Sequence, residues 1–298
     1  ALDATYANQS RVRFNNTVNA TTQVIPYRNT TGVFSYGTIE LNGVGGAGNS
    51  NTKQAAGPLD INGNITFAGN GSVIFDDGNF NHTIAGDWLI GSTIYATPGA
   101  TSSITFDGTN QQLIGNNNAS YRFRHLIIAN ATNVVSVNFT SGNGNTLIIL
   151  GNLNIGNAAI MDASTRSITI GGDWIQSGTG VFTQTGTTTF NSTTVEQVIN
   201  VGTPATSYFG NLTISKNVGG APQTVTAQTD MNVVGNFTFT TNQAIFDASN
   251  MTVKVGGNWT QNVTTTFVST GSTLVFNGTI AQAINNLGTS PTFNNITF

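Results

Sequence analysis

The chain has 298 residues, of which only 7% are charged, and its formal net charge at pH 7 is -3. A charge this small and this thinly spread gives no reason to expect a nucleic acid or an anionic membrane surface as partner. The chain contains no cysteine, so neither a disulfide framework nor a thiolate metal site is available.

The first residue is Ala1, and no basic and apolar leader follows it, which we expect of a processed, mature product. No apolar run approaches the roughly 18 residues that span a bilayer, so we expect a protein that is not membrane-embedded. Hydrophobic residues make up 38% of the chain and occur in short β-branched and aromatic runs. This pattern favours a packed all-β fold over disorder.

In chain order, residues 1–11 are expected to form an N-terminal extension or linking strand, and residues 12–298 a single β-solenoid domain. Within that domain a unit of roughly 85 residues recurs, which is the signature of a repeat architecture. Its copies cover residues 12–85, 86–171 and 172–256, with a half copy over 257–298. Three sets of residues recur in step with the unit: Asp76, Asp162 and Asp247; Trp88, Trp174 and Trp259; Phe106, Phe190 and Phe276.

A finer period of about 21 residues divides each unit into four, and each step starts with a polar residue, an apolar residue and often Thr. Three short strand-like runs occupy each step, as one turn of a parallel β-helix requires. The sequence therefore predicts a β-solenoid of about fourteen coils, with parallel pairing between coils and inward columns of like residues. The steps begin at Asn64, Asp87, Asp107, His125, Asn152, Asp173, Asn191, Asn211, Asn236, Asn258, Asn277 and Asn295.

The three tryptophans follow Gly-Asp or Gly-Asn and take the apolar second position of a step. Other steps place Ile65, Leu126, Leu153, Leu212, Phe237 and Ile296 there. We expect the tryptophans to be wide members of one interior column, four coils apart. The alternative is a sugar-stacking platform, but rings about 19 Å apart could not grip one oligosaccharide residue by residue.

Tandem units such as G-N-L-T-I at 210–214 and G-G-D-W at 171–174 resemble those of prokaryotic extracellular surface and adhesin-like proteins with β-solenoid repeats. The resemblance covers nearly the whole chain from about residue 12. It implies a parallel β-helix and an extracellular or cell-surface location.

Parallel β-helices also include polysaccharide lyases and hydrolases, which use clustered carboxylates, often with Ca²⁺. The repeat-equivalent aspartates at 76, 162 and 247 should be spread along the solenoid. Two pairs keep a catalytic or calcium role open: Asp87 with Asp107, which would stack on successive coils, and Asp76 with Asp77. His82 and His125 are expected at the surface. Our prediction is that the chain has no catalytic residue, metal ligand or cofactor and is not an enzyme.

Eighteen Asn-x-Ser/Thr sequons occur, about twice the number that random order would give. The motif could belong to the solenoid turn, as Asn ladders followed by Thr, or mark glycan acceptors that give a weakly charged surface a polar coat. We expect a mixture, with the loop-like Asn15, Asn19, Asn70, Asn118, Asn130 and Asn262 as better acceptors. The others are Asn8, Asn29, Asn64, Asn81, Asn138, Asn191, Asn211, Asn236, Asn250, Asn258, Asn277 and Asn295.

The final strand, FNNITF at 293–298, is apolar, and no polar cap is recognisable at either end of the predicted solenoid. Uncapped ends leave backbone groups free to pair with another chain. The sequence thus predicts a glycosylated structural subunit of an extracellular filament, sheath or surface layer, a homopolymer assembled head-to-tail. An adhesin or glycan-binding module is the first alternative, and a polysaccharide lyase or hydrolase is the second.

Overall fold

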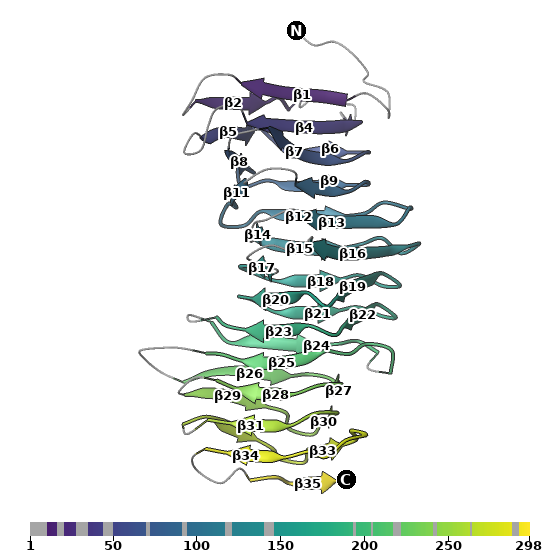
Figure 1. The fold of residues 1–298 in the computed structure, drawn as a ribbon, viewed down its shortest axis with the longest axis vertical. Coiled ribbons are helices and arrows are strands. Elements are labelled where there is room, and N and C mark those ends of the chain that lie inside the picture. The colour runs from purple at the N-terminus through teal and green to yellow at the C-terminus, as the bar shows by residue number, and fades with distance from the viewer. Residues whose placement is uncertain are drawn as a thin grey trace. The chain divides into compact units, whose positions relative to one another are not determined.

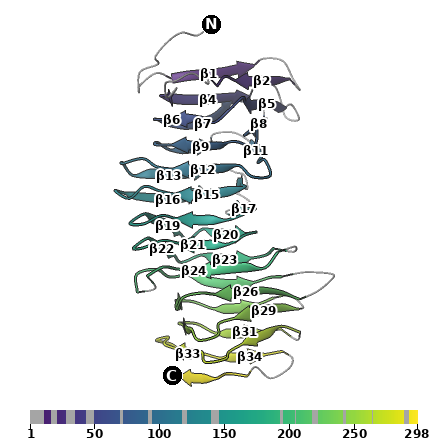
Figure 2. The ribbon, with the colours of Figure 1, turned by 180° about the vertical axis from the view of Figure 1, so that it is seen from behind.

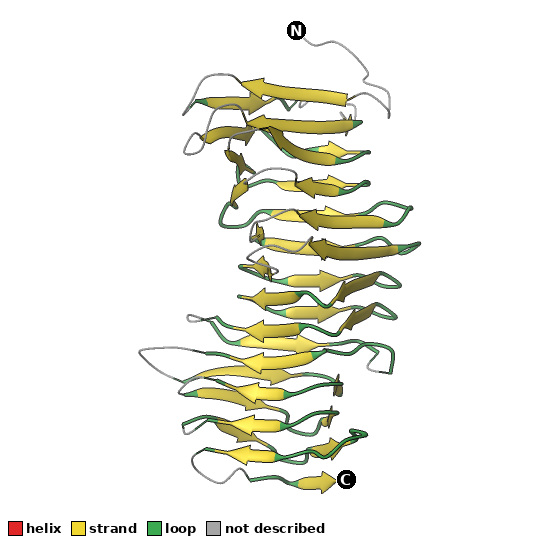
Figure 3. Cartoon of the chain, viewed as in Figure 1, coloured by secondary structure: helices red, strands yellow, loops and turns green. Residues whose placement is uncertain are grey.

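A computed structural model describes residues 11–16, 21–27, 35–43, 50–69, 72–90, 94–116, 121–139, 146–192, 195–203, 205–216, 222–240, 243–262, 264–287 and 292–298. The chain divides into two compact units, Ala1–Ile148 and Ile149–Phe298, which we call unit 1 and unit 2. Every regular element in these ranges is a β-strand, and none is a helix (Figure 3). The predicted all-β class is therefore confirmed.

The strands of unit 1 are short and follow one another at regular intervals (Figure 1). They are β1 (Arg11–Asn16), β2 (Thr22–Ile25), β3 (Ser35–Tyr36), β4 (Thr38–Gly43), β5 (Ser50–Ala55), β6 (Asp60–Ile61), β7 (Ile65–Gly69), β8 (Ser72–Asp76), β9 (Asn81–Ile84), β10 (Trp88–Ile90), β11 (Ile94–Thr97), β12 (Ser103–Phe106), β13 (Gln112–Asn116), β14 (Tyr121–Phe123), β15 (His125–Ile128) and β16 (Val134–Phe139). The next strand, β17 (Thr146–Ile149), reaches the boundary of the unit.

Unit 2 continues the same pattern of short strands. They are β18 (Leu153–Ile155), β19 (Ile160–Ser164), β20 (Ser167–Ile170), β21 (Trp174–Gln176), β22 (Val181–Gln184), β23 (Thr187–Phe190), β24 (Gln197–Asn200), β25 (Asn211–Ile214), β26 (Gln223–Ala227), β27 (Met231–Val233), β28 (Phe237–Phe239), β29 (Ala244–Asp247), β30 (Thr252–Val255), β31 (Trp259–Gln261), β32 (Thr266–Val268), β33 (Thr273–Phe276), β34 (Ile284–Asn286) and β35 (Asn295–Thr297).

The first four turns of unit 1 contribute one strand to each of three sheets, whose orders are β1-β4-β7-β10-β13-β16, β2-β5-β8-β11 and β3-β6-β9-β12-β15. Figure 2 shows β4, β7 and the strands that follow as stacked rungs seen from behind. In unit 2 the main orders are β18-β21-β24-β26-β29-β32, β20-β23-β25-β28-β31-β34 and β27-β30-β33-β35. Neighbouring strands are parallel, as in β4 on β7 and β28 on β31. The predicted parallel β-solenoid is confirmed.

The turns are longer than the fine sequence period predicts. In unit 1 the register places Ile39, Ile65, Trp88 and Ile114 on one another, so the intervals between these residues are the lengths of successive turns. The longest sheet order within each unit has six strands, and each turn contributes one of them. The two units together therefore have fewer turns than the fourteen or so predicted. The count was too high because Asp107 follows β12, whereas Asp87 precedes β10, so the predicted starts mark different corners of a turn.

The recurring unit does not make a whole number of turns. Three full turns lead from β21, which contains Trp174, through β24 and β26 to β29. Trp259 lies in β31, two strands further on and in a different sheet. Because a turn has three strands, the repeat spans about 3⅔ turns. The prediction that the tryptophans share one column, four coils apart, is therefore wrong.

All three tryptophans are interior, as predicted, with exposed fractions of 0–2%. Each packs against phenylalanine rings. In unit 2, the ring centroid of Trp259 lies 4.8 Å from that of Phe237 and 4.9 Å from that of Phe267, both edge to face. Phe106, Phe190 and Phe276 are also buried. Strand alternation explains why these side chains are buried. Successive side chains of a strand point to opposite faces, so every second one points into the solenoid.

Replacing Trp259 with Ala should lower the free energy of unfolding by about 3–5 kcal/mol, because the change leaves a cavity among closely packed rings. Denaturant titration followed by circular dichroism measures the effect. Thr260→Ala is the control, since Thr260 is the half-buried residue that follows Trp259 in β31. Equal losses in the two variants would contradict an interior role for Trp259.

Candidate functional site

The strongest recurring polar feature is a ladder at the corners where strands begin, which we call the Asx ladder. A side-chain oxygen of Asn or Asp accepts a hydrogen bond from a backbone N–H of the next turn. In unit 1, Asn64 Oδ1 accepts from Asp87 N, and Asp87 Oδ1 accepts from Leu113 N, both at 2.8 Å. These bonds satisfy backbone donors at corners, where strand pairing does not reach.

Unit 2 contains two further stretches of the Asx ladder. In the first, Asn152 accepts from Asp173 N and Asp173 from Val198 N, both at 2.9 Å. In the second, Asn211 accepts from Asn236 N at 2.9 Å. Asn236 and Asn258 continue it, accepting from Asn258 N and Ala283 N at 2.8 Å. The polar residue that opens a step is thus a hydrogen-bond acceptor for the turn that follows.

The ladder explains why glycine precedes Asp or Asn in these motifs. A methyl group at Gly172 would overlap Asn152 Oδ1 and come within 2.5 Å of the Gly151 carbonyl carbon. Gly86, Gly235 and Gly257 are in the same position above Asn64, Asn211 and Asn236. Glycine is needed there for space, since any Cβ would displace the oxygen that the next amide uses.

Three glutamines form a second recurring contact, which sequence reasoning missed. Gln112, Gln197 and Gln282 occupy equivalent positions in the second and third copies and the half copy of the repeat, and each Nε2 donates to two carbonyl oxygens of the turn below. Each Oε1 accepts a backbone N–H from the same corner, as Gly278 N to Gln282 at 2.8 Å. Their constant spacing in the sequence was a signal that could have found them.

The repeat-equivalent aspartates are turn residues. Asp76, Asp162 and Asp247 each accept, through Oδ1, the backbone N–H two residues further on, at 2.8–2.9 Å. This is an Asx turn, which favours the chain reversal at the end of a strand.

Asp87 and Asp107 do not stack as the enzyme alternative requires. The residue that bonds to Asp87 Oδ1 from the next turn is Leu113, through its backbone N–H. Asp107 N donates instead to Ile84 O, at the end of β9. Burial raises the pKa of Asp87, and burial together with the Asp60 carboxylate raises the pKa of Asp107. Asp60, whose carboxylate contributes to this pKa shift, was not singled out in the sequence.

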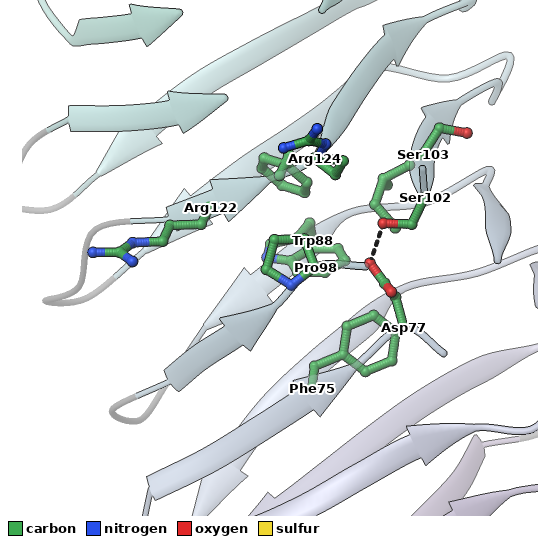
Figure 4. A pocket seen from close by; sticks show the side chains of 10 residues that line it. Phe75, Asp77, Trp88, Pro98, Ser102, Ser103, Arg122 and Arg124 are labelled. Atoms are coloured by element: carbon green, nitrogen blue, oxygen red, sulfur yellow. Dashed lines mark hydrogen bonds between the residues drawn. The ribbon is translucent and has the colours of Figure 1, made fainter. Parts of the chain in front are cut away.

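Asp77 lies in a buried polar cluster with Ser102 and His82. Ser102 Oγ donates to Asp77 Oδ2 at 2.5 Å (Figure 4), and Asp77 Oδ1 accepts from Gly99 N at 2.9 Å. His82 Nδ1 accepts from Leu59 N at 3.0 Å, so its Nε2 carries the proton and donates to Asp77 O. Burial lowers the pKa of His82.

This cluster differs from a catalytic Ser-His-Asp arrangement. A catalytic histidine accepts the serine proton and is oriented by the carboxylate. Here both ring nitrogens of His82 bond to backbone, and Ser102 bonds to the carboxylate itself. The expectation that His82 is a surface residue is wrong, since it is 1% exposed, and His125 is half-buried. The cluster ties three successive turns together.

Among the described residues, two of the hollows lie beside these elements. One, beside Trp88 and Asp77, holds about 10 Å³ and is also lined by Arg122 and Arg124 (Figure 4). It is no larger than one water molecule needs. The other, of about 200 Å³ in unit 2, is lined by Ala205, Asp230, Met231, Asn232, Thr252 and Lys254. None of these six residues is aromatic, so this hollow offers no ring on which a sugar could stack.

The sequons differ in accessibility. Asn130 is buried, and its Nδ2 donates to Asn110 O at 2.6 Å and to Gln112 Oε1 at 3.0 Å. In the folded protein, the Asn130 nitrogen that a glycan would need is therefore not accessible. Asn262 Nδ2 donates to Thr240 O at 3.0 Å.

The remaining sequons fall into three groups. Asn64, Asn211 and Asn258 are half-buried. Five predicted acceptors lie outside the described residues: Asn8, Asn19, Asn29, Asn70 and Asn118. The exposed ones are Asn15, Asn81, Asn138, Asn191, Asn236, Asn250, Asn277 and Asn295.

Large apolar side chains are exposed together at one edge of unit 2, on the rung formed by β32, β34 and β35, which we call the open rung. Each of these strands is the last in its sheet. Ile284, Leu287, Ile296 and Phe298 are exposed by 38%, 64%, 39% and 85%. An apolar cluster at a sheet edge is a typical interaction surface.

Comparison with known proteins gives no relative: no family model, curated protein or solved structure matches the chain. In the described part of the chain, no helix is long and apolar enough to cross a membrane. No group of three or more His, Cys, Asp or Glu side chains is placed to hold a metal ion there either.

Gly172→Ala should lower the free energy of unfolding by about 1–3 kcal/mol, because the new methyl group overpacks the corner and displaces Asn152 Oδ1. Gly115→Ala is the matched control, since a methyl group there would meet the movable end of Leu113 at 3.1 Å. Thermal unfolding of both variants tests the ladder. Equal melting temperatures would contradict the proposed need for glycine.

The two buried lysines should make stability depend on pH. Burial lowers the pKa of Lys53 and of Lys216 to about 8. Lys216 Nζ donates to Val195 O at 2.8 Å, and Lys53 Nζ donates to Gln23 Oε1 at 2.8 Å. An unfolded lysine titrates near 10.4, so between about pH 8 and 10 the unfolded chain holds more protons than the folded one.

Stability should therefore rise with pH across that window. Replacing Lys53 and Lys216 with Met should remove most of the rise, as measured by denaturant titration from pH 7 to 10. Between pH 5 and 7 both lysines are charged in either state, so the slopes of wild type and variant should coincide. A rise of unchanged size in the double variant would refute this assignment.

Proposed function

We propose that the chain is a structural subunit of an extracellular filament, sheath or surface layer, in which copies join head-to-tail by stacking solenoid rungs, and that it carries N-linked glycans. The single observation that carries the proposal is the open rung of unit 2. Its exposed side chains belong, by sequence, to the interior of the solenoid.

The repeat makes this comparison direct. Ile284 is 38% exposed, whereas its equivalent one repeat earlier, Ile199, is 0% exposed. Ile296 is 39% exposed, and its equivalent Leu212 is 0% exposed. Wherever the motif recurs inside unit 2, a further turn covers these residues. Exposure of such apolar area is unfavourable by roughly 25 cal/mol per Å², so a covering surface is favoured.

The surface that fits the open rung is a turn of this same sequence, since that is what covers the equivalent residues elsewhere. The turn formed by β1, β2 and β3 offers one, because each of these strands is the first or last in its sheet. In β1, Phe14 pairs in register with Leu41 of β4 and is buried with it. Its strands therefore have the inward alternation that a rung needs.

Joining the first turn of one copy to the open rung of another uses two different surfaces. Such a heterologous contact, repeated in one direction, generates a filament when the rotation does not close. Parallel pairing throughout both units supports the same strand direction at the junction. The adhesin and lyase alternatives have no comparable observation in their favour among the described residues.

Ile284→Asp and Phe298→Asp should prevent assembly, because each places a charge where apolar contact is needed. Electron microscopy and sedimentation should show filaments for the wild type and separate subunits for the variants. Val234→Asp is the matched control, since Val234 is 45% exposed but lies away from the open rung, in the corner after β27.

Phe298 is the more exposed of the two test residues, so its replacement should leave the melting temperature of the isolated subunit unchanged. Wild-type protein that stays monomeric at high concentration would refute the proposal. So would filaments formed equally by the wild type, the Ile284 variant and the Phe298 variant.

A further inference from the structure

Some sequon asparagines are also members of the Asx ladder, which raises the question of whether one side chain can serve both purposes. The four that combine both features are Asn64, Asn211, Asn236 and Asn258. Among them, Asn236 is exposed, and the other three are half-buried.

The ladder uses only one of the two polar atoms of the carboxamide. Asn236 Oδ1 accepts from Asn258 N at 2.8 Å, and Asn236 N donates to Asn211 Oδ1 at 2.9 Å. Within the described part of the chain, Nδ2 of Asn236 makes no hydrogen bond. This nitrogen is the atom that an N-linked glycan uses.

Strand alternation keeps the whole sequon in place. Asn236 directly precedes β28, whose first two residues are Phe237 and Thr238, and Phe237 is fully buried. Because successive side chains point to opposite faces, Asn236 and Thr238 both point outward. The core therefore fixes the orientation of the acceptor and of the threonine that defines the motif.

We infer that Asn236 carries an N-linked glycan while its Oδ1 holds the next turn, so that the Asx ladder and the glycan share one side chain. The reaction forms a bond between Nδ2 and the sugar C1, breaks the C1–O bond to a lipid-linked phosphate donor and releases one proton from Nδ2. The donor and transferase come from the host. Nothing in this step removes the lone pairs of Oδ1.

The spacing of the neighbouring ladder positions favours a single glycan on this stretch of the Asx ladder. Asn211 and Asn258 lie one rung below and one rung above Asn236, at the strand spacing of about 4.8 Å. A sugar ring needs about that much room, and both neighbours are less exposed than Asn236. The glycan at Asn236 therefore covers the nitrogens of the other two.

The chain itself shows how to separate the two roles. Asp87 and Asp173 occupy ladder positions and accept the same backbone bond through a carboxylate. An aspartate can therefore maintain the ladder, although it has no nitrogen to glycosylate. Asn236→Asp should keep the hydrogen bond and lose the glycan, whereas Asn236→Ala should lose both.

The experiment is peptide mapping by mass spectrometry, combined with thermal unfolding, of the full chain expressed in a host with N-glycosylation. The wild-type peptide that contains Asn236 should carry a glycan mass, absent from Asn236→Asp and from Thr238→Val. Melting temperature should fall by several degrees only in Asn236→Ala. Asn258→Asp is the control, expected to leave the mass at Asn236 unchanged.

An unmodified Asn236 in the wild type overturns the inference, and so does a melting temperature as low in Asn236→Asp as in Asn236→Ala. The inference rests on the glycosylated subunit proposed above, but the two can fail separately. Filaments formed by wild-type protein without sugar at Asn236 would refute only the inference. A modified chain that never assembles would refute only the filament.

Discussion

The structure depends on how the backbone is satisfied at the corners between its short strands. Strands of two to six residues leave many amide groups outside the regular pairing of the sheets. A strand-opening Asn or Asp accepts one of these amides from the next turn, as Asn152 does from Asp173. At Gly172 this contact leaves no room for a Cβ, and the residue that follows the Asx points inward. Gly172, Asp173 and Trp174 therefore act together. Gly172 leaves space for Asn152 Oδ1, the backbone N–H of Asp173 donates to that oxygen, and Trp174 packs in the core.

The sequence predicts the architecture correctly, but it does not predict the length and number of the turns. Short alternating runs and the recurrence of Trp88, Trp174 and Trp259 predict parallel stacking and a buried aromatic interior, and both are confirmed. The number of turns was wrong because Asp87 and Asp107 look alike in sequence but occupy different corners. Only strand register shows which corner a polar residue occupies, and register depends on pairs that lie one whole turn apart along the chain.

Polar residues inside the solenoid were the other gap. Gln197 is fully buried, yet the polar stretch around it, TTVEQ, does not indicate this, and only its recurrence as Gln112 and Gln282 could have done so. Lys216 is buried as well, with its ammonium group on a backbone carbonyl. Both residues donate hydrogen bonds to backbone carbonyl oxygens at or near corners, so, like the Asx ladder, they help to satisfy the backbone there. The periodicity of apolar residues cannot reveal these buried polar side chains, because it reflects only the apolar side chains that pack in the core.

The fractional repeat has a consequence for the outside of the molecule. Because the unit advances by three turns and two strands, equivalent outward residues are rotated by about a third of the circumference from one copy to the next. Asn191 follows β23, and its equivalent Asn277 follows β33, which belongs to another sheet of unit 2. Duplication of a single stretch of sequence thus places equivalent outward residues on successive sides of the solenoid.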